Sequence, residues 1–228
     1  MDRINAPRLN SEFPVKLSKQ TGLVAYFQGK GHLAIDFCLY LIETNLKASS
    51  DTALLFLHGG AQPLHGLTKH LARPEYYERI FGVNLPGDYI RQRANHPKIV
   101  AALNETKVLN WERIVLVDTG FKGRTAAQVI DLLNDTRLLD YTGQPLSRNN
   151  WSTVVVLLCL RGRNRQAAEY NIQGYNDICG QSRDRVFEDV AFLIEEGVMP
   201  GKKISEVIPF SRDEITQALI QAAGPVPF

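Results

Sequence analysis

Cysteine is scarce in this chain of 228 residues, which contains only three. Cys38, Cys159 and Cys179 are far apart, so they show no disulfide framework and no paired spacing typical of a zinc site. An odd number of scattered thiols is typical of a reducing compartment. We therefore expect a cytoplasmic protein.

The chain also has no long hydrophobic run and no large excess of positive or negative residues. No apolar stretch approaches the length of a membrane span, and the start MDRINAPRLNSEFP lacks the apolar core of a secretory signal. The formal net charge is +2, from 26 Lys and Arg against 24 Asp and Glu. So small an excess gives no overall field for anionic polymers. We therefore expect no membrane association, and nucleic acid is not indicated as a partner.

The composition that remains is that of a globular protein, with 44% hydrophobic and 22% charged residues. Short apolar runs alternate with helical patterns along the middle of the chain. Strands are predicted at 53–57, 79–83, 114–117 and 153–160, and helices at 63–71 and 125–133. Because strands that alternate with helices pair in parallel, we predict an α/β fold with a mainly parallel sheet flanked by helices.

The boundaries of these patterns suggest three regions. Residues 1–52 are predicted to form an N-terminal arm and helix, and residues 53–160 the α/β core. Residues 161–228 are predicted to form a C-terminal helical accessory region. A chain of this length can also bury one continuous core, so a single domain remains an alternative.

The most informative segment is RIVLVDTGFKGRTAAQVIDLL, which starts at Arg113. Its apolar run predicts a strand buried on both faces, which places Asp118 at the carboxyl edge of the sheet. From Thr125 onward apolar residues recur at helical spacing, so a helix is expected to start there. A helix start offers free N–H groups and a positive dipole, and Lys122 and Arg124 add two cations. The segment therefore predicts a phosphate-binding loop.

A second strand–loop–helix unit has the same design. The strand ending at Leu57 is followed by His58, Gly59 and Gly60 and then by a helical pattern. In a parallel sheet both loops lie at the carboxyl edge, where open α/β sheets bind ligands. We therefore expect the two loops to form one site.

With these two loops the chain resembles the type I phosphoribosyltransferase family, over roughly residues 53–160. LLFLHGGAQPLHGL is similar to the element that binds pyrophosphate in that family, and VLVDTGFKGRTAAQVIDLL to the one that binds ribose 5-phosphate. The residues implied for the 5-phosphate are Lys122, Gly123, Arg124, Thr125 and Ala126. The residues implied for pyrophosphate are His58, Gly59 and Gly60, joined by Arg91 and Arg93 where the family has a mobile loop.

The resemblance also implies the catalytic positions. The family has two adjacent acidic residues beside the ribose hydroxyls, which support the magnesium-bound sugar. Asp118 occupies the first of these positions and Thr119 the second, so one carboxylate is missing. Asp118 and Thr119 are therefore the expected catalytic residues, with Asp118 as the candidate magnesium ligand.

We expect a phosphoribosyltransferase-like protein that binds phosphoribosyl pyrophosphate or a nucleotide and transfers a phosphoribosyl group. The main alternative, supported by Thr119, is a non-catalytic regulatory protein that binds a nucleotide or sugar phosphate. A minor alternative is that Asp118, Thr119 and Gly120 resemble the motif of retropepsin-like aspartic proteases, which need two carboxylates. The acceptor base is not indicated, and a homodimer remains open.

Overall fold

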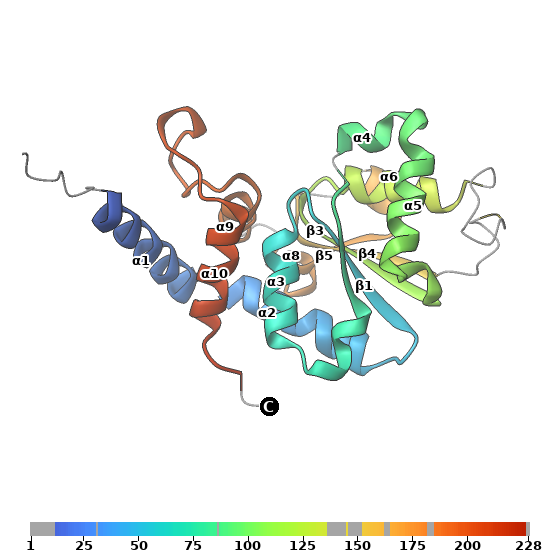
Figure 1. The fold of residues 1–228 in the computed structure, drawn as a ribbon, viewed down its shortest axis with the longest axis horizontal. Helices are drawn as coiled ribbons and strands as arrows, with labels where there is room; N and C mark the ends of the chain where they lie inside the picture. Colours follow the sequence, from blue (N-terminus) through green and yellow to red (C-terminus); the bar gives the residue numbers. More distant parts are fainter. Residues whose placement is uncertain are drawn as a thin grey trace, which may run out of the picture.

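The computed structural model describes residues 12–30, 32–85, 87–135, 145, 152–161, 165–181 and 185–226. A five-stranded sheet crosses the molecule, and its neighbouring strands are all parallel (Figure 1). The strands are β1 (Thr52–Leu57), β2 (Ile80–Val83), β3 (Arg113–Phe121), β4 (Ser152–Leu160) and β5 (Ile172–Gly174). Helices cover both faces, so the predicted α/β class with a mainly parallel sheet is confirmed.

The strand order is β2-β1-β3-β4-β5, so the chain adds strands on opposite sides of β1. In open α/β sheets such a reversal of strand order leaves a crevice above the carboxyl ends, where ligands bind. Phe56 of β1 is paired with Val117, and β1 ends at the next residue, whereas β3 continues to Phe121. The loop after β1 therefore begins beside the last residues of β3. Asp118, which we expected at the strand end, lies inside β3 because β3 pairs with β4 up to Phe121.

One face of the sheet is covered by helices from both ends of the chain and by the helix that follows β1. These are α1 (Glu12–Lys30), α2 (His32–Leu41), α3 (Gln62–Leu71), α9 (Arg185–Glu196) and α10 (Arg212–Ala223), with the short α8 (Tyr175–Ile178). A π-helical turn, Ile42–Lys47, continues α2. Their buried apolar side chains form one core cluster with Val115 and Val117 of β3.

The opposite face carries α5 (His96–Thr106) and α6 (Arg124–Leu133), with the short helices α4 (Gly87–Arg91) and α7 (Arg165–Glu169). Buried residues of these helices pack with Ile114 and Leu116 of β3 in a second core cluster. Short 3₁₀ turns lie at Pro74–Arg79, Arg93–Asn95, Val108–Asn110 and Ile204–Glu206. The sheet therefore separates two cores that β3 contacts through alternate residues.

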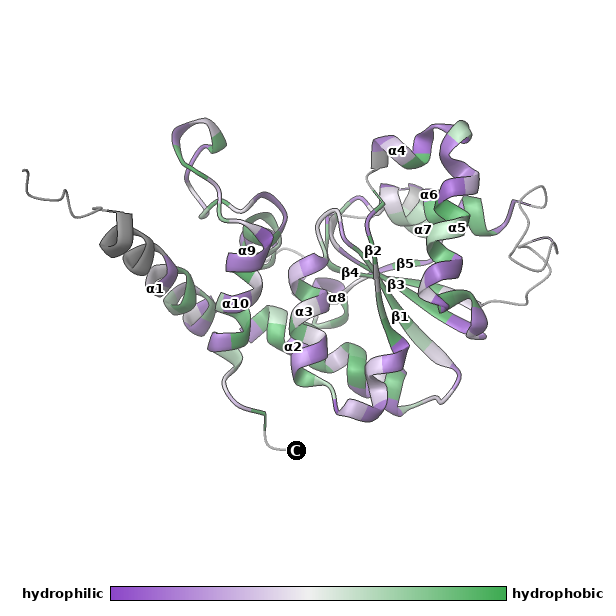
Figure 2. Ribbon diagram, in the orientation of Figure 1, coloured by the Kyte–Doolittle hydropathy of each residue, from purple (hydrophilic) through white to green (hydrophobic). Residues whose placement is uncertain are grey.

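The sequence patterns explain these elements. Every residue of β1 is buried, as expected for a central parallel strand covered on both faces, and hydrophobic colouring dominates β1 in Figure 2. In α6 the buried Ala126, Val129, Ile130 and Leu133 recur every three or four residues, which gives the helix one apolar face. That face packs on the sheet and directs the start of α6 to the carboxyl edge.

The regions expected from the sequence share their cores. β5 comes from the region after residue 160 and pairs with β4. In the same core cluster, α9 and α10 pack with α2 and α3, and α1 lies along α10 (Figure 1). The three regions are therefore in contact with one another in the described part of the chain. Within the described ranges, no helix combines the length and the apolar character needed to cross a bilayer.

Candidate functional site

The loop after β1 folds tightly against β3. The N–H of Ala61 donates to the carbonyl of Leu57 at 3.0 Å, which closes the turn. Gly60 is buried, and a Cβ at this position would lie 2.3 Å from Thr119 Oγ1 and 3.5 Å from Asp118 Oδ1. Glycine is needed here because any side chain would push the loop away. Two elements that were predicted to share a site are therefore in direct contact.

Asp118 is a nearly buried carboxyl group at this contact, with 9% of its surface exposed. Its Oδ1 accepts a hydrogen bond from the N–H of Thr119 at 2.8 Å. Burial, aided by the nearby charge of Glu195, raises the pKa of Asp118 from 3.8 to about 7, against the lowering effects of Thr119 and Arg212. A carboxyl group that titrates near neutral pH can both accept and donate a proton under physiological conditions. Asp118 therefore has the properties of an acid–base group.

Glu195 of α9 is a second carboxylate at the site. Its Cγ lies 3.5 Å from the position that a Cβ of Gly60 would take. Glu195 Oε2 is buried and has no hydrogen-bond partner within the described part of the chain. Burial raises its pKa, and the charge of Glu196 raises it further, whereas Arg212 lowers it. The site therefore holds two carboxyl groups that both resist ionisation.

Arg212, the first residue of α10, supplies the positive charge. Its Nη2 donates to the carbonyl of Gly59 at 3.1 Å, and its Nη1 donates to the carbonyl of Ile194. Burial lowers the pKa of Arg212, while the charges of Glu195, Glu196 and Asp118 raise it. The guanidinium thus connects the loop after β1 with α9 and partly neutralises the carboxylates.

The sequence interpretation did not include Glu195 or Arg212. Both occupy polar positions of amphipathic helices, where charged residues most often face solvent. One local signal was available, since Ser211 and Glu214 form a capping box that fixes the start of α10 at Arg212. That signal places the residue on the helix, but the contact with Gly59 depends on tertiary packing.

Thr119, a predicted catalytic residue, is completely buried. Its Oγ1 lies 3.5 Å from Asp118 Oδ1, to which it donates, and it packs where Gly60 leaves room. This position allows Thr119 to hold Asp118 and the glycine loop in place. It gives the hydroxyl group no exposed surface with which to contact a substrate.

The start of α6 follows β3 through Lys122 and Gly123. Lys122 and Arg124 are exposed, Thr125 is half-buried, and the N-cap residue provides no side-chain hydrogen bond to the first turn. The first-turn N–H groups, including that of Ala126, have no carbonyl partner inside the helix, which is the usual basis of anion binding. The start of α6 therefore offers backbone N–H groups beside two exposed cations.

Gly123 has a different role from the one that the sequence suggested. It is buried, has a φ of 66°, and a Cβ there would lie 2.5 Å from Ile172 Cδ1 and 3.5 Å from Leu157 Cδ1. Its Cα therefore faces the core beside β5 and not a ligand. Glycine is required at this position for the left-handed turn and for packing on the sheet.

His58, expected to bind pyrophosphate, is turned toward its neighbours. Its Nε2 lies 3.0 Å from His65 Nδ1, and the ring fills the space above Gly82. Burial lowers the pKa of His58, and the charge of Lys69 lowers it further. A neutral imidazole paired with another imidazole provides no positive charge for pyrophosphate.

Arg91 and Arg93 lie on the side of the sheet that carries α6. Arg91 ends α4 and Arg93 begins the following 3₁₀ turn, and both line a cavity with residues of α6. The loop with Gly59 and Gly60 leads instead into α3, on the opposite face. The structure therefore places the two arginines beside the part of α6 that starts at Gln128, and not beside the glycine loop with which they were predicted.

The position where a magnesium ligand was predicted has one carboxylate, that of Asp118. In the described residues, no set of three or more His, Cys, Asp or Glu side chains is arranged to hold a metal ion. Carboxylate oxygen is a ligand that Mg²⁺ prefers, and the ion is commonly bound by one or two carboxylates together with substrate phosphates. Asp118 fits that mode, with the orphaned Glu195 Oε2 nearby as a further oxygen.

No family model, curated protein or solved structure matches this chain. The carboxyl edge of the sheet combines a glycine loop, a carboxyl group of raised pKa and a helix start with two cations.

Proposed function

We propose that this protein binds a sugar phosphate or nucleotide in the crevice between β1 and β3, as a phosphoribosyltransferase-like protein that handles phosphoribosyl pyrophosphate. The observation that carries the proposal is the position of Asp118, which touches the glycine loop at the point where the strand order reverses. The start of α6 opens at the same edge. These elements provide complementary partners for the hydroxyl groups and the phosphate of one ligand.

The phosphate would bind at the start of α6. The N–H groups of the first helical turn, together with Lys122 and Arg124, supply donors and positive charge. Asp118 would accept hydrogen bonds from the ribose hydroxyls, because its Oδ1 is a carboxylate oxygen beside the glycine loop. A bound magnesium ion would add positive charge to the pyrophosphate, with Asp118 as its protein ligand.

Proton transfer is the chemistry that Asp118 itself could perform. With a pKa of about 7 when no metal is bound, the carboxyl group can exchange a proton with a ligand near neutral pH, whereas a magnesium ion on Asp118 would keep it ionised as a ligand. Burial is the main cause of this raised pKa, and Glu195 and Arg212 adjust it, because their charges act on Asp118 from α9 and α10 in opposite directions. They are positioning residues in the proposed reaction.

A non-catalytic binding protein is the second candidate, and the burial of Thr119 favours it. A buried hydroxyl group replaces the second carboxylate, so the part that binds phosphate is retained while the part that acts on ribose is reduced. The protease alternative is less well supported. Asp118 and Gly120 belong to a parallel strand, and the neighbouring carboxylate is Glu195 of the same chain rather than a second copy of the motif.

Calorimetry with ribose 5-phosphate and phosphoribosyl pyrophosphate tests the proposal. Arg124→Gln should weaken both ligands about tenfold or more, since hydrogen bonds to charged groups contribute about 1.5–3 kcal/mol. The control Lys30→Gln removes an exposed cation at the end of α1 and should bind like the natural protein. The proposal is wrong if neither ligand binds, or if both variants bind alike.

The same assay separates the enzyme from the binding protein. An enzyme should bind phosphoribosyl pyrophosphate more tightly with magnesium and release pyrophosphate when a suitable base is added. Asp118→Asn should then lose most of this release. A binding protein should show no release with any common base and little change in affinity on Asp118→Asn.

A further inference from the structure

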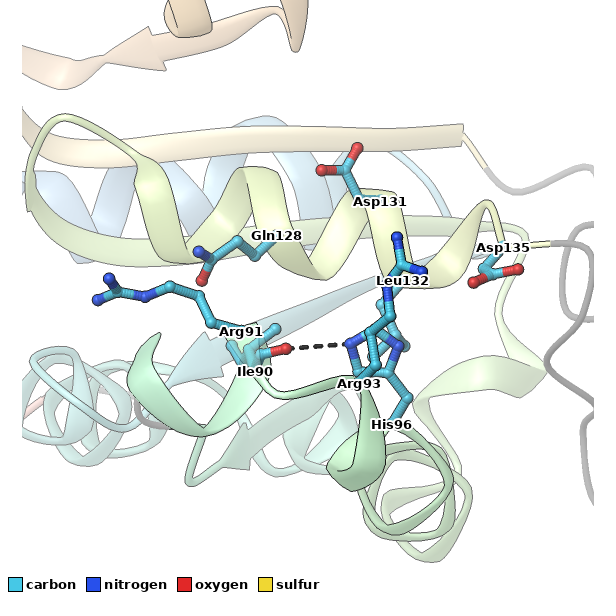
Figure 3. A pocket seen from close by; sticks show the side chains of 8 residues that line it. All are labelled: Ile90, Arg91, Arg93, His96, Gln128, Asp131, Leu132 and Asp135. Carbon is cyan, nitrogen blue, oxygen red and sulfur yellow. Dashed lines mark hydrogen bonds between the residues drawn. The ribbon is translucent and has the colours of Figure 1, made fainter.

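A cavity of about 380 Å³ lies between α6 and the segment that leads from α4 to α5 (Figure 3). Ile90 and Leu132, each 2% exposed, contribute apolar surface to it. The other lining side chains are polar and come from both walls: Arg91, Arg93, His96, Gln128, Asp131 and Asp135. The volume falls in the range of small-molecule sites. Its mixed lining suits a compact molecule with apolar faces and polar edges.

Gln128 provides the strongest indication of a ligand. Its Oε1 is buried and has no hydrogen-bond partner among the described residues. Figure 3 shows its side chain directed from α6 toward the wall that carries Arg91. Native proteins rarely leave a buried acceptor without a donor, because the lost hydration is not replaced. A ligand with an N–H group would supply that donor.

The charges around the cavity are polarised. Arg91 extends along the Gln128 side of the cavity, whereas Arg93 extends toward Asp131 (Figure 3). Asp131 accepts a hydrogen bond from the hydroxyl of Tyr170 at 2.7 Å, which holds its carboxylate in place. Figure 3 shows this carboxylate on the far side of α6 from Arg91. Anionic groups are therefore favoured near Gln128.

Arg91 places a cation on this wall of the cavity. Its ion pair with Asp88 is largely exposed, with 64% and 88% of the two side chains accessible. Ion pairs of this kind contribute little to stability. His96 Nε2 lies 3.0 Å from the carbonyl of Ile90, which can only accept, so this nitrogen carries the proton.

The cavity lies further along α6 than the proposed phosphate site. Arg124, Gln128 and Asp131 follow one another at spacings of four and three residues, which places them on one stripe of α6. Gln128 is about 6 Å along the helix axis from Arg124, at a rise of 1.5 Å per residue. The organic group of a phosphate ester bound at the helix start would therefore lie within reach of Gln128.

We infer that the cavity between α4 and α6 binds the nitrogen heterocycle of a nucleotide. A ring or amino N–H donates to Gln128 Oε1, and the faces of the ring lie against Ile90 and Leu132. The inference rests on the proposed function for the position of the phosphate, but the contacts to the ring can be tested without a phosphate.

The test compares Gln128→Met with the natural protein. Calorimetry measures the binding of AMP, GMP, CMP, UMP and ribose 5-phosphate, and ligand-observed NMR measures the four nucleosides. Gln128→Met keeps the length of the side chain and removes the acceptor, so it should weaken at least one nucleotide and its nucleoside about tenfold. Ribose 5-phosphate should bind as before. Gln217→Met, at an exposed position of α10, is the matched control and should change nothing.

The possible failures are distinguishable. If ribose 5-phosphate binds but no nucleotide or nucleoside depends on Gln128, the inference is wrong and the proposed function stands. If ribose 5-phosphate does not bind while a nucleoside loses affinity on Gln128→Met, only the phosphate site is wrong. An equal loss for ribose 5-phosphate and nucleotides would also overturn the inference, because it indicates a general distortion of α6. Urea midpoints of both variants check that the fold is intact.

Discussion

Replacing Asp118 with asparagine should stabilise this protein above neutral pH and do little at acidic pH. The folded protein raises the pKa of this carboxyl group from 3.8 to about 7, so ionisation opposes folding. Below pH 3.8 the group is protonated in both states and has no effect. Between 3.8 and 7 the unfolded chain ionises first, and stability falls as the pH rises.

The size of the effect follows from the two pKa values. The shift from 3.8 to about 7 corresponds to about 4 kcal/mol at 1.36 kcal/mol for each pKa unit, reached fully above pH 7. Asparagine keeps the oxygen that accepts from the N–H of Thr119 but carries no charge. Asp118→Asn should therefore unfold with a free energy higher by up to about 4 kcal/mol at pH 8, and by less than about 1 kcal/mol at pH 4.

Urea unfolding followed by circular dichroism at pH 4, 6 and 8 measures this difference. Asp36→Asn, at an exposed position of α2, controls for the loss of a carboxylate and should show no comparable trend. A difference between Asp118→Asn and the natural protein that stays constant with pH would refute the reasoning. It would mean that Asp118 is ionised in the folded protein at neutral pH, and the acid–base role would lose its support.

Two further predictions concern the contacts around Asp118. Gly60→Ala should lower the free energy of unfolding by about 1–3 kcal/mol, because its Cβ would overlap Thr119 Oγ1, and Thr119→Ala should restore part of that loss in a double-mutant cycle measured by urea unfolding. Arg212→Met should cost about 1–2 kcal/mol through the lost hydrogen bond to Gly59, with a larger loss at pH 8 than at pH 5, because the ionised carboxylates lose their cation. Additive effects at Gly60 and Thr119, or a loss at Arg212 that is independent of pH, would contradict these contacts.

The sheet could be predicted from the sequence because each main strand can be recognised from its own run of apolar residues. The apolar runs of β1, β3 and β4 predict buried strands, and the helical spacing in α6 describes its buried face. Asp118 and the glycine loop could be placed together for the same reason, since parallel strands bring their carboxyl ends to one edge. The extension of β3 to Phe121 was not predicted, because it depends on pairing with β4.

Residues whose role depends on distant contacts could not be predicted. Gly123 was interpreted as part of a phosphate loop, but its Cα faces Ile172, a residue of β5 that no local pattern connects to it. His58 was assigned to pyrophosphate, but its pairing with His65 depends on how α3 packs. Glu195 and Arg212 were missed for a similar reason, because the two helices that carry them meet Gly60 and Gly59 only in the folded protein.

The most direct test of the proposed function is a crystal structure of the protein with ribose 5-phosphate. The account predicts the phosphate at the N–H groups of Arg124, Thr125 and Ala126, with the ribose hydroxyls toward Asp118 and the glycine loop. A ligand bound elsewhere, with the start of α6 contacting only solvent at saturating concentration, would contradict it.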